Sequence, residues 1–507
     1  MAASFESGTL SQRRCFSRSL LRWRQIISVA WDSRHLGQTE PHRCHIGRDF
    51  WAALCTFSSG CYIRRVPGAV QVSAASSIST HTLVLIRRGS GNGARLGVLV
   101  RWYVGILMPR SFLVLQGTAS SFFSQLGQAL TRNGHAVLRV NFCGGDLLYG
   151  RTGVTVSYRG AMGDLPDWYR QIVQKQGVTD VLMFGDCREV HRHMHPIAQA
   201  FGLRTYVFEE GYIRPHWLTL EPHGVNGRSL LPRDPAWYLR QRSVVPRSMP
   251  GVPTGYNLYE RAFHDISYRC ANALFAVRFP NYRSHRPRNG LAEYTGLAAM
   301  ALRQAGRERE AKEVTNALLA GQKKYFLFPL QLNSDAQIVV HSPFDGIREA
   351  LSHVLLSFAS AAPEDAVLVV KNHPLDTGLI DYRRYAFRLA NELGIQHRLL
   401  FIDSGHLPTL LEHARGVVVV NSTVGLSALH HKRPLAALGT AVYDMEGLTW
   451  QGSLDDFWKY SESPDMDLYH AFLDYVMHHT QINGDFYTRT GIAMAVAGSV
   501  ERLEAAI

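Results

Sequence analysis

From residue 108 onward, short apolar runs alternate with longer stretches in which apolar residues recur at helical spacing. The apolar runs, which predict buried strands, are 111–115, 136–140, 180–184 and 205–208. The stretches with helical spacing are 122–133, 163–176 and 190–201. Strands that alternate with helices form a parallel sheet covered on both faces. We therefore predict a Rossmann-like domain over residues 108–228.

The same alternation returns after an interruption. Residues 229–320 begin with five prolines between 232 and 253 and continue with a helical pattern over about 257–317, which indicates an insertion or hinge. The later runs predicted as strands are 325–328, 366–370, 399–402 and 416–420, and those predicted as helices are 346–361, 382–393, 407–414 and 426–431. They predict a second Rossmann-like domain over residues 321–480.

The last segment, residues 481–507, contains an amphipathic pattern over 487–507 that predicts a helix able to pack back across the domains. Two Rossmann-like, parallel-sheet domains that face a cleft describe a GT-B-like α/β fold. No repeats follow Met108.

Residues 1–107 differ from the rest in composition. They carry 14 Arg, no Lys and 4 acidic residues, and little sustained periodicity. An Arg-rich, acid-poor start is typical of an organellar transit peptide. We favour a second interpretation, in which Met108 is the native start and the preceding leader is disordered or non-native. The glycine-rich stretch Gly89–Gly93 is not a dinucleotide-binding loop, because no helical pattern follows it.

The composition excludes several classes of protein. The net charge is +13, but most of it lies in the leader, so no nucleic-acid partner is expected. The seven Cys are scattered without CxxC or zinc spacing, which favours a reducing compartment and no metal site. The chain contains no run of eighteen apolar residues, so we predict no membrane-spanning helix.

An acidic pair at the end of a predicted strand is the first candidate for chemistry. Glu209 and Glu210 follow the run 205–208 and precede Gly211, which permits a sharp turn. Ligands bind at the carboxyl ends of strands in open α/β sheets. Adjacent carboxylates repel each other, so one is expected to have a raised pKa. The alternative is a solvated acidic turn.

The second predicted domain carries two further motifs at strand ends. Lys371, His373 and Pro374 follow the run 366–370, where a histidine and a lysine can bind a phosphate or a leaving group. The phosphate cradle predicted after the run 416–420 consists of Asn421, Ser422 and Thr423. Each has a plain alternative: an incidental histidine in a helix-start loop, and simple N-capping by a hydroxyl.

Other polar residues follow strands and should line the cleft, without an assigned role. They are Gln116, Gly117, Asp186, Arg188, Gln331 and Asp335. Asp186 can equally cap a helix or pair with Arg188. A metal site among His191, His193 and His195 is disfavoured because no carboxylate or Cys completes the set. Nothing in the sequence indicates a lowered pKa for Cys187.

Taken together, these motifs resemble those of CMP-sugar transferases such as bacterial sialyltransferases, and more closely the KpsS-type capsule polysaccharide proteins. The segments that carry the resemblance are FLVLQG (112–117), FGDCR (184–188), FEEGYIRPHWLTLE (208–221), FPLQLNSD (328–335), KNHP (371–374) and NSTVG (421–425). The resemblance covers roughly residues 108–480. In the related KpsC-type pattern an Asp usually stands where this chain has Glu210.

The resemblance implies a retaining β-Kdo transferase that uses CMP-Kdo, a donor substrate, and needs no cofactor. The implied acceptor is a phosphatidylglycerol-type lipid, or Kdo already on it, and the product begins the poly-Kdo capsule linker. It also implies a cytoplasmic protein, peripheral on the inner face of the cytoplasmic membrane, in contact with capsule assembly and export proteins.

Roles follow from that chemistry as hypotheses. Glu210 would stabilise the oxocarbenium-like centre or attack it, and Glu209 would support it or act as acid/base. Lys371, His373, Ser422 and Thr423 would hold the CMP phosphate and stabilise it as it leaves, and Arg214 would pair with the Kdo carboxylate. Pro374 and Asn421 would belong to the same donor-binding site. Two alternatives remain: a non-enzymatic assembly or export component, and a UDP-dependent sugar-nucleotide epimerase.

Overall fold

The computed structural model describes residues 109–150, 153–284, 290–321, 324–333 and 335–505, together with four short strands nearer the N-terminus. Those strands are β1 (Cys61–Val66), β2 (Ala69–Ala74), β3 (Val84–Arg87) and β4 (Leu96–Leu99). They form two antiparallel pairs, β1 with β2 and β3 with β4. The remainder of the predicted leader lies outside the described residues, so its interpretation stays a prediction.

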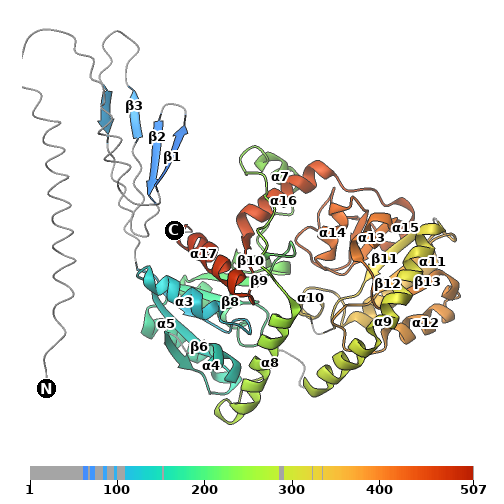
Figure 1. Ribbon diagram of the computed structural model, residues 1–507, viewed down its shortest axis with the longest axis horizontal. Helices are drawn as coiled ribbons and strands as arrows, with labels where there is room; N and C mark the ends of the chain where they lie inside the picture. The colour runs from blue at the N-terminus through green and yellow to red at the C-terminus, as the bar shows by residue number, and fades with distance from the viewer. Residues whose placement is uncertain are drawn as a thin grey trace, which may run out of the picture. The chain divides into compact units, whose positions relative to one another are not determined.

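The first domain is built on a seven-stranded sheet (Figure 1). Its strands are β5 (Ser111–Val114), β6 (Ala136–Asn141), β7 (Val154–Ser157), β8 (Asp180–Phe184), β9 (Arg204–Glu210), β10 (Trp217–Pro222) and β16 (Gln481–Asn483). The order across the sheet is β16-β10-β9-β8-β5-β6-β7. The five strands from β9 to β7 are parallel and follow the Rossmann order 3-2-1-4-5.

Alternating side chains of the strands explain how both faces of this sheet are buried. Phe112 and Val114 point to a core shared with α3 (Phe122–Arg132) and α17 (Arg489–Ala505). Leu113 points to the opposite core, formed with α5 (Leu165–Gln176) and α6 (Met194–Phe201). The C-terminal helix therefore packs on the first domain, whereas the sequence pattern predicts a helix that packs across both domains. The short α4 (Gly144–Tyr149) follows β6.

The second domain has a five-stranded, wholly parallel sheet. Its strands are β11 (Tyr325–Pro329), β12 (Val367–Lys371), β13 (Leu399–Ile402), β14 (Gly416–Val419) and β15 (Leu435–Ala437). The order β13-β12-β11-β14-β15 again reads 3-2-1-4-5. The prediction of two Rossmann-like, parallel-sheet domains in a GT-B-like α/β fold is thus confirmed.

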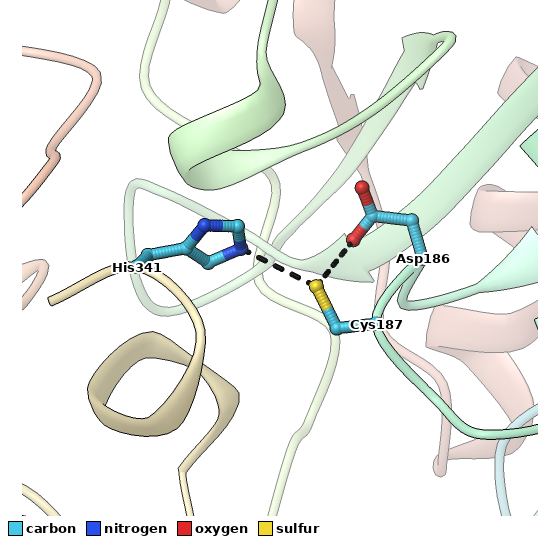
Figure 2. A group of neighbouring side chains, drawn as sticks. All are labelled: Asp186, Cys187 and His341. Atoms are coloured by element: carbon cyan, nitrogen blue, oxygen red, sulfur yellow. Dashed lines mark hydrogen bonds between the residues drawn. The ribbon is translucent and has the colours of Figure 1, made fainter. Parts of the chain in front are cut away.

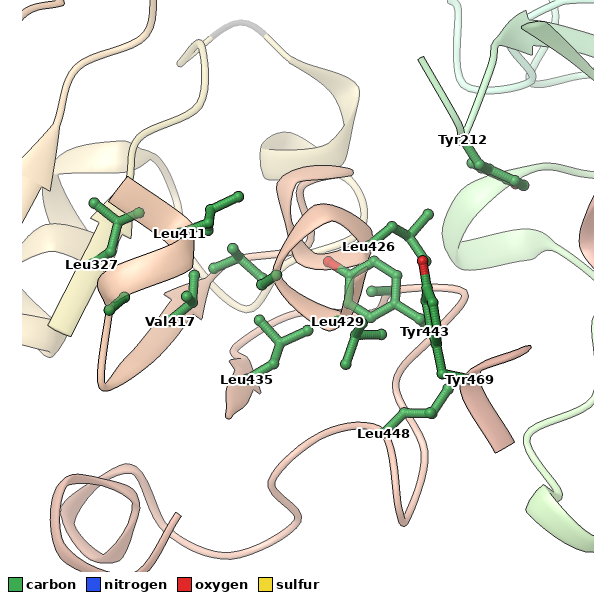
Figure 3. Close-up of a cluster of buried hydrophobic side chains, with 14 of the residues drawn as sticks. Tyr212, Leu327, Leu411, Val417, Leu426, Leu429, Leu435, Tyr443, Leu448 and Tyr469 are labelled. Carbon is green, nitrogen blue, oxygen red and sulfur yellow. The ribbon is translucent and has the colours of Figure 1, made fainter. Parts of the chain in front are cut away.

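Two apolar cores cover the faces of the second sheet. One face packs against α11 (Ile347–Ala361), α12 (Tyr382–Glu392) and α15 (Leu454–Tyr460). The other packs against α9 (Gly290–Ala320), α13 (Leu407–His413), α14 (Val424–His430) and α16 (Met466–Thr480). Figure 3 shows this second core, in which Leu327, Leu426 and Tyr443 gather, with Tyr212 of the first domain at its edge.

The structure also differs from the sequence prediction in local ways. β9 continues through Glu210, so the acidic pair belongs to the strand itself and pairs with β10. Helix α6 begins at Met194, whereas the pattern predicts a start near 190. Two antiparallel strands, β10 and β16, extend the first sheet beyond the parallel part. β16 lies at 481–483, so the chain joins the first sheet again after the second domain.

The insertion between the two sheets is largely helical. Its helices are α7 (Pro235–Gln241) and α8 (Leu258–Leu274), followed by α9, and α10 (Ala336–Val339) comes after β11. None of the helices that the structure describes is both long enough and apolar enough to cross a membrane.

Candidate functional site

The strand order brings the candidate residues of each domain to one edge of its sheet. In the first sheet, β8 is the neighbour of both β5 and β9, so the residues that follow β5 and β8 adjoin the end of β9. In the second sheet, β11 separates β12 from β14. The motifs after these three strands therefore share an edge, although they are far apart in the sequence.

Glu209 is held in a half-buried position beside the loop that follows β8. Its Oε1 accepts the backbone N–H of Glu210 at 3.0 Å. Gly185 has φ +65°, and a Cβ added there would stand 3.3 Å from Glu209 Oε2, so this position favours glycine on two counts. Burial, together with the neighbouring charge of Glu210, raises the pKa of Glu209 to about 7, against the opposing effects of the Glu210 N–H and Arg188.

Glu210 makes contacts that Glu209 does not share, because successive side chains of a strand point to opposite faces. The Tyr487 hydroxyl donates to Glu210 Oε1 at 3.1 Å. The Arg261 guanidinium of α8 lies 3.5 Å from the same oxygen and 5.1 Å from the centre of the Tyr487 ring. Sequence reasoning missed Arg261 and Tyr487, since neither belongs to a strand-end motif.

The loops after β5 and β8 are tied to each other. Arg188 donates to the carbonyl of Gly117 at 2.8 Å and to Gln116 Oε1 at 3.4 Å. Gln116 in turn donates to Asp146 Oδ2 and to the Tyr282 hydroxyl, each at 3.1 Å. Gln116 is buried, and these bonds use its amide for holding the loop. Arg188 therefore pairs with this loop rather than with Asp186.

His373 has a defined orientation in the second domain. Its Nδ1 accepts the backbone N–H of Leu375 at 3.0 Å, so the neutral ring carries its proton on Nε2. Burial, with the charges of Lys371, Arg214 and Arg261, lowers the pKa of His373 to about 4. At neutral pH the ring is thus an uncharged donor. Burial also lowers the pKa of Lys371, with Asp403 opposing.

The motif after β14 is connected to the loop after β11. Gln331 Nε2 donates to Asn421 Oδ1 at 3.1 Å, and the Asn421 amide donates to the carbonyls of Gln337 and His341 at 2.8 and 3.1 Å. Asn421 and Gln331 therefore position these loops. Ser422 Oγ accepts the Val424 N–H at 3.2 Å in the turn before α14. The N-cap residue of α14 is Thr423, whose side chain makes no capping hydrogen bond, so simple N-capping does not account for this motif.

A small pocket lies where the two domains meet at this motif. Thr423, Asn421 and Tyr443 line it from the second domain, and Tyr212 and Asn226 line it from the first. It is lined by polar atoms as well as by apolar ones. Asn421 and Thr423 therefore adjoin residues of the first domain, and their role as a phosphate cradle stays a prediction.

Arg214 connects the candidate residues electrostatically. Its side chain is exposed, and its Nε donates to the Gly211 carbonyl at 3.3 Å. Its charge lowers the pKa of His373 and opposes the rise that burial causes in the pKa of Asp335. Asp335 in turn contributes to the raised pKa of Glu209. The charged residues of the two domains thus act on one another across a single site.

A second group of side chains joins the domains beside this site (Figure 2). Cys187 Sγ donates to Asp186 Oδ1 at 3.2 Å and lies 3.4 Å from His341 Nε2. Burial raises the pKa of the Cys187 thiol to about 12, with Asp186 adding to the shift, so Cys187 is not set up as a nucleophile. Sequence reasoning missed His341, which comes from the loop after α10.

Asp186, Cys187 and His341 are residue types that bind zinc, and their ligand atoms lie within 4.8 Å of one another. Positive charge is already nearby: Arg228 lies 3.7 Å and His195 3.9 Å from Asp186 Oδ2. The hydrogen bonds within the trio hold it together without an ion. The expectation that no metal is required stays a prediction.

The three histidines near α6 do not form a cluster of their own. His191 is fully buried, and its Nδ1 lies 2.5 Å from the Gly185 carbonyl. His193 precedes the helix and lies 3.2 Å from Arg192. His195 lies 3.9 Å from Asp186 Oδ2, and its charge is one of the effects that lower the pKa of His191.

One buried carboxyl of the first domain was also missed. Glu221 accepts the Tyr212 hydroxyl at 2.5 Å and the Ser229 hydroxyl. Burial raises its pKa to about 7, against the opposing effects of those two hydroxyls. It lies within the segment 208–221 that carried the family resemblance, but a lone Glu on a strand gave no reason to single it out. Pro374, by contrast, is exposed beside His373.

Comparison with known proteins gives the family to which the chain belongs. The family model described as "Capsule polysaccharide biosynthesis protein" matches residues 179–487. The capsule polysaccharide export protein KpsS of Escherichia coli is 35% identical over 389 residues, 75% of this chain and 98% of its own length. The capsule polysaccharide modification protein LipB of Neisseria meningitidis serogroup A is 34% identical over 385 residues, 75% of this chain and 92% of its own length.

Among solved structures, the KpsC β-Kdo 2,7 transferase of Thermosulfurimonas dismutans is similar with a TM-score of 0.36 and 14% identity, over 77% of this chain and 99% of that one. The family match covers more than half of the chain, and it includes the acidic pair, the 371–374 motif and the 421–423 motif. The chain belongs to the capsule polysaccharide biosynthesis protein family.

Proposed function

We propose that the protein is a retaining glycosyltransferase that moves Kdo from CMP-Kdo to a phosphatidylglycerol-type lipid and so begins the poly-Kdo linker of a capsule. The observation that supports the proposal most is the electrostatic pairing of the two domains: Arg261, which contacts Glu210, also lowers the pKa of His373, a neutral donor beside Lys371. An export component that only binds a finished polymer has no need of such a pairing. The sugar and its nucleotide follow from the motif resemblance.

In the first step, a carboxylate oxygen of Glu210 attacks the anomeric carbon of Kdo. The bond from that carbon to the phosphate oxygen breaks, and CMP leaves with the electron pair. Arg261 and the Tyr487 hydroxyl hold the Glu210 carboxylate in place. The Nε2–H of His373 and the ammonium group of Lys371 stabilise the charge on the departing phosphate.

In the second step, the lipid hydroxyl attacks the same carbon and releases Glu210, which gives net retention. The hydroxyl proton passes to Glu209, which leaves the opposite face of β9 from Glu210 but stands at the same strand end, where the Glu210 charge acts on it. Its pKa of about 7 suits a general base near neutral pH. Arg214, exposed and close enough to act on both domains, pairs with the carboxylate of the sugar. The hydroxyl and backbone groups of Ser422 and Thr423 bind the CMP moiety.

The test is incubation of the purified full chain with CMP-Kdo and a short-chain phosphatidylglycerol. We expect release of CMP and a lipid heavier by one Kdo in the mass spectrum. Glu210→Gln and His373→Ala should each abolish or strongly reduce both signals. Glu392→Gln, an exposed carboxylate on α12, is the matched control and should leave them unchanged.

Two results would contradict the proposal. Transfer at the unmodified rate in both site variants would overturn the assignment of residues. Tight binding of lipid-linked polymer without any CMP release by the unmodified chain would favour the non-enzymatic export component instead.

A further inference from the structure

Helix α8 exposes large apolar side chains on the face opposite to the one that packs. Its inner face holds Tyr268 and Ala271, both buried against α4. The contact is close, because a Cβ added to Gly144 would stand 2.1 Å from the Ala271 carbonyl oxygen, and one added to Gly145 would stand 2.3 Å from the Tyr268 ring. One side of α8 is therefore fixed to the first domain, and Figure 1 shows the two helices together.

The exposed side forms a continuous stripe. Its members, with their exposed fractions, are Tyr259 (87%), Phe263 (67%), Ile266 (46%), Leu274 (77%) and Val277 (93%), the last in the short turn that follows the helix. Separations of four, three and eight residues place the first four on one side of α8, and Val277 follows them in the turn. Exposed Cys270 occupies the gap between Ile266 and Leu274. We call this set the α8 stripe.

Such a stripe is costly in water. A single exposed apolar side chain is ordinary, but a contiguous row on one helix face marks a surface that contacts something apolar. A surface helix needs only one apolar face to pack on its own domain, so a second apolar face on the opposite side has no packing role within that domain. The described residues supply a partner for the inner side of α8, and the α8 stripe remains exposed.

The charge around the α8 stripe indicates what it contacts. From the start of α8, residues 258–284 contain four arginines, no lysine and two acidic residues. Arg278 and Arg283 are exposed at the C-terminal end of the stripe, and Arg269 flanks it in a pair with Asp265. Basic side chains beside an apolar face with Phe, Tyr and Leu are the composition of helices that lie in an anionic lipid interface.

The position of α8 relative to the candidate site supports the same conclusion. Arg261 is on the inner side of this helix and contacts the Glu210 carboxylate. A surface that rests on the α8 stripe is thus separated from Glu210 by about the width of one helix, roughly 10 Å. A lipid whose headgroup is to receive a sugar at Glu210 has to come this close.

We propose that the α8 stripe is the surface by which this protein docks on an anionic phospholipid bilayer, with the apolar side chains in the acyl boundary and the arginines at the headgroups. The choice of phosphatidylglycerol as the anionic lipid rests on the proposed function. The docking itself rests on the exposure of the stripe and the charge of its surroundings.

The experiment is flotation of the purified full chain with vesicles of phosphatidylcholine alone and of phosphatidylcholine with phosphatidylglycerol. We expect the chain to float with the anionic vesicles at low salt, and less so at high salt. The double substitution Phe263→Ser with Leu274→Ser should reduce the bound fraction at least tenfold. Leu356→Ser, on α11 and 51% exposed in the unmodified chain, is the matched control and should float normally.

Kdo transfer to a water-soluble acceptor that consists of the headgroup alone serves as a separate test of folding. The double variant should retain this transfer. Equal flotation of the double variant and the unmodified chain would overturn the proposal, as would flotation of neither. A change in oligomeric state of the double variant, with flotation intact, would show that a second copy covers the stripe. Failure of Kdo transfer with stripe-dependent flotation would refute only the proposed function.

Discussion

Replacement of Glu209 by Gln separates the electrostatic cost of this carboxyl from its role in catalysis. Gln keeps the size of the side chain and removes the ionisable group. Burial raises the pKa of Glu209 from an ordinary 4.5 to about 7. Because one pKa unit corresponds to 1.36 kcal/mol, ionisation of Glu209 costs about 3 kcal/mol more in the folded chain than in the unfolded chain.

The sign of the pH dependence follows from that raised pKa. Below about pH 4.5 the carboxyl is protonated in both states, so Glu209 contributes no difference. Between pH 4.5 and 7 the folded chain binds more protons than the unfolded chain, so the free energy of unfolding falls as the pH rises. Above pH 7 the full cost of about 3 kcal/mol is present. Glu209→Gln should therefore gain stability relative to the unmodified chain as the pH rises from 5 to 8.

The assay is urea unfolding of both proteins at pH 5 and pH 8, followed by the midpoint of the transition. Glu209→Gln should have a higher midpoint at pH 8 and nearly the same midpoint at pH 5, while Kdo transfer is lost at both. Glu392→Gln, which removes an exposed carboxylate, should show no such pH dependence. A midpoint difference for Glu209→Gln that is the same at both pH values would show that burial does not raise the pKa of this carboxyl.

Three further predictions concern the same carboxylates. Transfer by the unmodified chain should rise with pH through about 7 as Glu209 loses its proton, and a kcat/KM profile that is flat from pH 6 to 8 would exclude it as the base. Tyr487→Phe removes the hydroxyl that donates to Glu210 and should lower kcat about fivefold, the equivalent of about 1 kcal/mol. The free energy of unfolding at neutral pH should fall by no more than about 1 kcal/mol. Gly185→Ala should cost about 1 kcal/mol or more of stability and also lower kcat, because it strains a residue at φ +65° and crowds Glu209. The control Gly177→Ala, at φ +55° with open space around it, should lower stability without affecting kcat. Equal losses of kcat in the two variants would contradict this prediction.

Much of the fold could be predicted from the hydrophobic pattern. The buried strands 180–184 and 399–402 are predicted to the residue, because a short, continuous apolar run between polar flanks is typical of a strand buried on both faces. The antiparallel strands β10 and β16 are absent from the sequence prediction. β10 has six residues, but polar residues at Thr219 and Glu221 interrupt its apolar run. β16 has only three residues, which pair with β10.

The candidate site divides in the same way. The strand-end rule placed the acidic pair, Lys371, His373 and Asn421 at sheet edges, and the structure has them there. The rule could not give Arg261 or Tyr487, which reach Glu210 from a helix and from the C-terminal segment. Nor could it show that Gln331 and Asn421 bond to each other rather than to a ligand.

The order of residues along the chain is enough to establish the periodicities, and through them two sheets with polar residues at the ends of their strands. Local pattern suffices for this because the alternation of a strand and the turn of a helix are properties of a few consecutive residues. Which charges act on each other depends instead on how the chain folds in three dimensions. A pKa near 7 for Glu209 and near 4 for His373 results from burial and from groups that are distant in sequence but close in space.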